Sequence, residues 1–331
     1  MLRAPLLSIE DLTTRARAHR HWLLPGFSLA LTIVTLYFVF RGIDRKIFAQ
    51  LVAAQDRSLL ITSAFFILLQ IDFGGERWRA ILSALARGQP PSLLSVQAVF
   101  YASIFFNCLP LGTVGGDVAR ILLARRFALS VRQIVLSVLV DRILAVAALI
   151  VLLLVTLPTI AHPLAITAWF AGAAILAAGA AGLLLLGAIE RVLGRWRQQR
   201  LIHLVLRTAE ELRFLTQQGG LYGLFWGVLS GTCSALAAYC IARSLHIGVG
   251  PLAMIAIMSL VTLLVALPIS MAGWGVREVS LVAALGLLGG DRAAALLLSV
   301  EFGLLSTLLS LPGGVIWLTL RERRQIGLPT K

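Results

Sequence analysis

The chain has 331 residues, of which 59% are hydrophobic and only 13% are charged, and its mean hydropathy is +0.92. Soluble domains carry about 25% charged residues, so this chain could not cover its surface in water. The net charge of +14 does not indicate nucleic-acid binding, because the arginines form short clusters between apolar runs and no nucleic-acid-binding module is present. The composition therefore predicts an all-α, single integral membrane domain over residues 1–331, with no nucleic-acid partner.

Apolar runs close to the ~20 residues that cross a hydrocarbon core recur along the chain. This criterion predicts about six full spans. They cover residues 22–40, 58–76, 133–157, 164–189, 221–243 and 294–318. The basic segment 1–21 precedes the first run, which ends in charged residues instead of a cleavage site. We therefore expect a retained first helix.

Two further apolar regions, residues 92–127 and 251–289, are each interrupted by a cluster of proline and glycine. The interruptions lie at residues 109–116 and 267–275. Proline and paired glycines break helices, and broken backbone at membrane depth must be buried in protein or line a wet cavity. Each region is therefore predicted to form a broken, re-entrant helical hairpin.

The order of the predicted elements indicates an inverted-topology repeat within a polytopic transmembrane helix bundle. Three of the predicted spans separate the hairpins, so the hairpins should open from opposite faces of the membrane. The repeat cores are residues 92–157 and 251–318, and each contains a span with an acidic residue. Transporters use such repeats to build a central binding site. In this topology the arginine-rich connections and both termini lie in the cytoplasm, as the positive-inside rule requires. The basic loop at residues 41–57 breaks the rule, because it would lie outside.

The segment 190–219 between the repeats is rich in arginine, and its apolar residues are spaced like one face of a helix. It is predicted to be a cytoplasmic amphipathic helix lying against anionic lipid. Small residues then recur every fourth position at Gly219, Gly223, Gly227 and Gly231. This row favours close helix packing, with a homodimer seam as the alternative.

Charged residues follow the glycines of each interruption. Asp117 and Arg120 follow the first interruption, and Arg277 and Glu278 follow the second. Each arginine is predicted to lie in the first turn of a new helix, where the helix dipole disfavours a cation. An arriving phosphate would balance this charge. The alternative is a set of internal struts, in which Arg120 pairs with Asp117 and Arg277 pairs with Asp141, Glu278 or Glu301.

Asp141, Arg142 and Glu301 lie inside apolar spans, where ionisable groups by default mark a pathway or binding site. The alternative for these residues is a fixed salt bridge. Asn107, before the first break, is expected to cap loose backbone or to contact a lipid headgroup. Four further residues are expected only to mark the membrane interface, and they are Asp72, Glu76, Arg77 and Arg79.

No catalytic constellation, nucleotide P-loop or metal-binding pair of histidines is found. We therefore expect neither an enzyme nor a bound cofactor or metal. The cysteines at positions 108, 233 and 240 have no metal-ligand spacing and are expected to be packing residues.

Two motifs carry a resemblance to a known family. They are Asn107-Cys108-Leu109-Pro110 with Gly115-Gly116-Asp117-Val118-Ala119-Arg120 and then Asp141-Arg142, and Leu267-Pro268-Ile269-Ser270 with Gly273-Trp274-Gly275-Val276-Arg277-Glu278. From about Leu59 to Leu320 the chain resembles the transmembrane region of the lysylphosphatidylglycerol synthase family, which is the flippase half of the bacterial multiple peptide resistance factor. The resemblance implies lipid translocation across a bacterial cytoplasmic membrane. Because the chain stops at Lys331, without an aminoacyl-transferring domain, synthase activity is not expected.

The first functional hypothesis is therefore a lipid flippase whose substrate, a phospholipid or other polar lipid, meets Arg120 and Arg277 through its phosphate. The acidic residues would balance these arginines or meet a cationic headgroup. The alternatives are a membrane-embedded transferase acting on a phospholipid or polyprenyl phosphate, and a non-catalytic partner of a lipid-modifying synthase.

Overall fold

The computed structural model describes residues 50, 52–86, 90–108, 112–160, 200–266 and 274–325, with a few isolated residues between 166 and 177. Throughout these residues the regular structure is helical, which confirms the all-α class. Within the described ranges, four helices are long and apolar enough to cross a membrane, and they are Arg57–Leu85, Val131–Thr159, Gly219–Ser244 and Arg292–Leu320. They agree with four predicted spans. The span predicted at 22–40 and most of the one at 164–189 lie outside the described residues.

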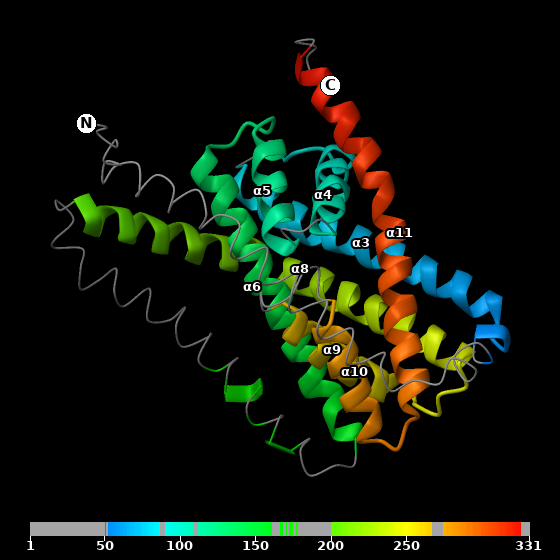
Figure 1. The fold of residues 1–331 in the computed structure, drawn as a ribbon. Helices are drawn as coiled ribbons and strands as arrows, with labels where there is room; N and C mark the ends of the chain where they lie inside the picture. Colours follow the sequence, from blue (N-terminus) through cyan, green and yellow to red (C-terminus); the bar gives the residue numbers. More distant parts are fainter. Residues whose placement is uncertain are drawn as a thin grey trace, which may run out of the picture.

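Four long helices of the described part of the chain form the frame of the bundle (Figure 1). They are α3 (Arg57–Leu85), α6 (Val131–Thr156), α8 (Arg200–Ser244) and α11 (Arg292–Gln325), and the short 3-10 helix η1 (Leu157–Thr159) follows α6. Asp56 caps α3 by accepting from the Ser58 N–H, and Ser130 forms a capping box with Gln133 at the start of α6. The described part of the predicted amphipathic segment, from Arg200 onward, is continuous with the span that follows it in α8.

Four shorter helices occupy the interrupted regions. They are α4 (Leu93–Asn107), α5 (Gly112–Ala124), α9 (Pro251–Val265) and α10 (Val276–Gly286), with 15, 13, 15 and 11 residues. Each is shorter than the ~20 residues needed to cross the hydrocarbon core. Within each region the two helices pack against each other. Residues 109–111 and 267–273 lie outside the described part of the chain, so a re-entrant path through the membrane stays a prediction.

The helix after the first interruption begins earlier than predicted. Because α5 begins at Gly112, Gly116 lies inside the helix and Arg120 lies two turns from its start, so the expected first-turn position of Arg120 is wrong. A Cβ on Gly116 would lie only 2.6 Å from the carbonyl oxygen of Ser103 in α4. This glycine therefore serves the close approach of two helices and does not end one. Arg277 does lie in the first turn of α10, as predicted.

The helix contacts follow an exchange rule. Helix α3 packs along α8; α6 packs against α9, and α11 packs against α4. In this rule α3, α4, α5 and α6 correspond to α8, α9, α10 and α11, in that order. For each pair of these helices that is in contact, the corresponding pair is also in contact. In Figure 1, α3 and α8 run in opposite directions, and α6 descends in the view whereas α11 ascends.

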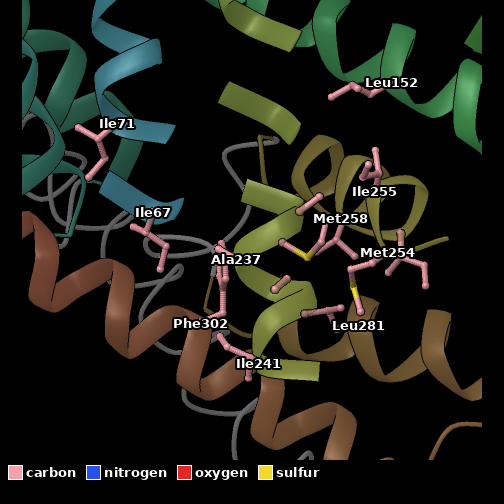
Figure 2. Packing of buried hydrophobic residues seen from close by; sticks show 14 of the residues in the cluster. Ile67, Ile71, Leu152, Ala237, Ile241, Met254, Ile255, Met258, Leu281 and Phe302 are labelled. Carbon is pink, nitrogen blue, oxygen red and sulfur yellow. The ribbon is translucent and has the colours of Figure 1, made fainter. Parts of the chain in front are cut away.

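One hydrophobic cluster joins both sets of helices across the middle of the bundle. Figure 2 shows part of it, where Met254, Ile255 and Met258 of α9 gather near Leu281 of α10, and Ala237 and Ile241 of α8 lie near Phe302 of α11. Ile67 and Ile71 of α3 and Leu152 of α6 belong to the same cluster. The two halves therefore share one core.

The glycine row on α8 packs against other helices of the same chain. A Cβ on Gly223, Gly227 or Gly231 would lie 2.7, 2.8 or 2.7 Å from a side-chain atom of α6, and these atoms belong to Leu144, Ala148 and Leu152. A Cβ on Gly219 would lie 3.3 Å from the carbonyl oxygen of Ala80 in α3. The predicted close packing is confirmed, and the row is not free to pair with a second copy.

Gly227→Leu is expected to lower the free energy of unfolding by about 1–3 kcal/mol, because the added side chain would force α8 away from Ala148. The measurement is denaturant unfolding in detergent micelles. Gly286→Leu is the matched control, because nothing lies within 4 Å of a Cβ at Gly286. Equal destabilisation by the two variants would contradict the packing role.

Candidate functional site

Two arginines from different helices share one buried carboxylate. Arg77 of α3 donates from Nε to Asp141 Oδ1 at 2.7 Å and from Nη2 to Oδ2 at 3.3 Å. Arg120 of α5 donates from Nη1 to Asp141 Oδ2 at 2.7 Å. The side chains of Asp141, Arg120 and Arg77 are only 1%, 4% and 11% exposed. Two positive charges against one negative charge leave this arginine–aspartate cluster (Arg77, Arg120, Asp141) with one excess positive charge.

Aromatic side chains hold the Arg120 guanidinium in position. Its Cζ lies 5.1 Å from the centre of the Trp78 ring and 4.7 Å from that of Phe100. Trp78 is itself fixed, because its Nε1 donates to Ser137 Oγ at 3.1 Å. Cation–π contacts of this kind stabilise a desolvated arginine. The Nε of Arg120 is buried without a hydrogen-bond partner, so the cluster offers an unused donor.

A second ion pair lies beside this cluster and joins α5 to α6. Arg142 donates to both carboxylate oxygens of Asp117, at 3.1 and 2.7 Å. Their side chains are 40% and 26% exposed, so this pair borders the buried arginine–aspartate cluster on its more open side. The alternative in which Arg120 pairs with Asp117 is wrong in its partner, because Arg120 pairs with Asp141. The α5 backbone presents Asp117 to Arg142 and Arg120 to Asp141, one turn apart.

Arg77 is a site residue that the sequence analysis missed. Arg77 was expected to mark the membrane interface. Instead, α3 continues for two more turns to Leu85, and the Arg77 side chain is largely buried within the bundle. The apolar residues that follow it, Ala80, Ile81 and Leu82, are the signal that could have placed it inside the membrane. Arg79 pairs with Glu76 at 3.3 Å and is half-exposed, and the carboxylate of Asp72 accepts from the Tyr101 hydroxyl at 2.9 Å.

The corresponding part of the other half holds a fully paired carboxylate. Glu278 is completely buried and accepts from the Gly275 N–H at 2.5 Å, from Ser299 Oγ at 3.1 Å and from Arg277 Nη2 at 2.9 Å. Arg277 also lies 4.7 Å from the centre of the Trp274 ring. Of the alternatives, pairing with Glu278 is therefore the one observed for Arg277.

The two clusters are related by position but differ in charge. Arg120 bonds Asp141 and Ser299 bonds Glu278 across the same sequence separation of 21 residues, each from a short helix to the long helix that follows it. The contact partner that corresponds to Asp141 is therefore Ser299, not Glu301. Among the described residues, no hydrogen bond or ion pair joins Arg277 to the arginine–aspartate cluster.

Asn107 and Glu301 lie apart from these ion pairs. The Asn107 carbonyl oxygen is buried without a partner, and the backbone at residues 109–111 that Asn107 was expected to cap lies outside the described part of the chain. The oxygen lies close to Gly116 in α5, where a Cβ would meet it at 1.9 Å. Glu301 accepts a hydrogen bond from the Gln55 amide. Within the described ranges, no group of three or more His, Cys, Asp or Glu could hold a metal ion, and the three cysteines are unpaired.

Long apolar helices that enclose buried ion pairs define a multi-pass membrane protein. The sequence matches the family described as the lysylphosphatidylglycerol synthase TM region over residues 27–314, which is most of the chain. The chain belongs to this family, and the predicted resemblance is confirmed. No curated protein matches it.

Proposed function

We propose that this protein is a transporter, and not an enzyme, that moves a phospholipid or related polar lipid across the membrane. The headgroup phosphate would bind at the arginine–aspartate cluster. The observation that carries this proposal is the excess positive charge buried where two guanidinium groups share one carboxylate. Buried charges in membrane bundles are costly unless paired, so an anion that completes the pairing is favoured.

The donor geometry suits a phosphate. Arg120 has an unused buried Nε, and its ring contacts with Trp78 and Phe100 fix the guanidinium plane. Arginine binds phosphate through paired N–H groups, and the aspartate keeps both arginines oriented when no lipid is present. The half-exposed Asp117–Arg142 pair provides polar groups on the way to the cluster. The same pair could meet a cationic group on an aminoacylated lipid.

The exchange rule in the helix contacts supports alternating access. Equivalent long helices run in opposite directions in Figure 1, as two inverted repeats would. Under this proposal, α4–α5 and α9–α10 are re-entrant hairpins, and rocking of one half against the other exposes the site to each side in turn. Both termini would lie in the cytoplasm of a bacterium, and a separate synthase would supply any modified lipid.

Reconstitution into vesicles with a labelled phospholipid tests the proposal. Arg120→Gln is expected to slow lipid movement at least about tenfold, since one charge-assisted hydrogen bond contributes about 1.5–3 kcal/mol. Arg77→Gln should act in the same direction. Arg79→Gln is the matched control, because Arg79 makes only a half-exposed pair with Glu76 and should leave transport intact.

If the wild type and the three variants moved lipid at equal rates, the arginine–aspartate cluster would have no role in transport. No movement by the wild-type protein would exclude autonomous transport. Co-purification of that inactive protein with a lipid-modifying synthase would instead support the partner hypothesis.

A further inference from the structure

Glu301 carries a carboxyl group in the membrane-spanning helix α11, and no cation among the described residues is bonded to it. Its Oε1 accepts a hydrogen bond from the Gln55 side-chain amide, and its Oε2 is buried without any partner. Asp141 and Glu278 differ from it, because each is bonded to at least one arginine. Nothing in the transport mechanism proposed above uses Glu301.

Arg277 of α10 lies on the other side of α11 from Glu301. Arg277 bonds Ser299, and its guanidinium lies against Gly303, where a Cβ would meet Nη2 at 2.0 Å. Ser299 and Gly303 are four residues apart and share a helix face. Glu301, two residues from each, points about 160–200° away from them. Arg277 therefore cannot neutralise Glu301.

The other helices packed against α11 offer no cation either, within the described side chains. These helices are α3, α4, α8 and α10. Their charged groups are bonded elsewhere or lie exposed: Arg277 with Glu278, Arg77 with Asp141, Arg79 with Glu76, Asp72 with Tyr101, and Arg57 and Arg243 at the surface. Helix α4 contributes Tyr101 but no charged side chain.

We propose that Glu301 is a proton-binding site, whose carboxyl group is neutral at neutral pH and releases its proton when the surroundings change. An isolated carboxylate is disfavoured inside a membrane protein, and adding a proton to Oε2 removes the charge. The Gln55 amide can serve both forms, because its N–H donates to a carboxylate oxygen and its carbonyl oxygen accepts from a carboxyl O–H.

The start of α3 lies between this site and the surface of the protein. Gln55 is half-buried, and the next residue, Asp56, is exposed. Hydrogen bonds from the Ser58 side chain and backbone hold the pKa of Asp56 below its usual value, so Asp56 stays ionised near neutral pH. An ionised acid at the surface and a neutral one behind it would let a proton enter from this side.

Carbodiimide labelling of the wild-type protein in lipid nanodiscs tests this inference. Dicyclohexylcarbodiimide is apolar and reacts with protonated carboxyl groups, so label should appear on the Glu301 peptide at neutral pH in mass spectra. Labelling should fall about tenfold per pH unit above the pKa of the acid. The Asp141 and Glu278 peptides are internal controls that should stay unlabelled, because an arginine side chain is bonded to each of these carboxyl groups and occupies the oxygens that the reagent would attack.

Infrared difference spectra supply a second measurement that does not depend on access of the reagent. The carbonyl stretch of a protonated carboxyl group should be present in the wild type and lost in Glu301→Gln. Absence of that band at neutral pH, or labelling of Glu301 that does not change with pH, would overturn the proposal. Both experiments need no lipid movement, so their outcome is separate from that of the transport assay.

Discussion

Asp141→Asn is expected to lower the free energy of unfolding by about 3–5 kcal/mol, which is the typical cost of breaking a buried ion pair. The substitution keeps the shape of the side chain but removes its charge. Arg77 and Arg120 would then face each other, buried and without an anion. Thermal or denaturant unfolding in mild detergent measures the loss. Added phospholipid should restore part of it if a phosphate binds the two arginines.

Asp117→Asn is the matched control for this prediction. Its ion pair with Arg142 joins the same two helices but is partly exposed, and such pairs contribute about 0–1 kcal/mol. The double variant Asp141→Asn with Arg120→Met should regain part of the stability, because it removes one of the unpaired charges. A cost for Asp141→Asn no larger than that of Asp117→Asn would show that the buried cluster is not a coupled unit.

Glu278→Ala is expected to be comparably severe, at about 3–5 kcal/mol. It would leave the Arg277 guanidinium unpaired in the interior and would remove the acceptor for the Gly275 N–H at the start of α10. Glu278→Gln keeps an acceptor for Gly275 and Ser299, so it should cost less than the alanine variant. Unfolding in detergent measures the stability, and limited proteolysis before Val276 should detect fraying of the helix.

Glu76→Ala tests the same chemistry in an ion pair that is partly exposed. Glu76 pairs with half-exposed Arg79 three residues along α3, and this pair should contribute well under about 1 kcal/mol. If Glu278→Ala cost no more than Glu76→Ala, the carboxylate at the start of α10 would have no structural role.

The long helices could be predicted from hydropathy alone, because crossing a membrane demands a long apolar run. The end of α3 could not be predicted in this way. Hydropathy treats Arg77 as an interface residue, whereas its partner, Asp141, lies 64 residues away along the chain. Only tertiary packing shows that the two charges meet.

The sequence predicted which charged residues form the candidate site better than it predicted which of them pair with each other. The sequence indicated that Arg120, Asp141 and Glu278 matter, but Gly115 and Gly116 were taken as helix breakers when they lie within α5. That error moved the expected helix start and with it the expected partner of Arg120. Similarly, Glu301 was grouped with Asp141 because both are acids in apolar spans, although only Asp141 has arginine partners.

The reciprocal packing of α6 on α9 and of α11 on α4 has a consequence for how the chain acquires its structure. Residues of α3–α6 and of α8–α11 form one shared hydrophobic cluster, so neither set of helices can complete this core by itself. During synthesis, α3–α6 therefore remain in the lipid bilayer with their inner face uncovered until α8–α11 have been translated and inserted. Maturation then resembles the assembly of a heterodimer whose two subunits happen to share one polypeptide.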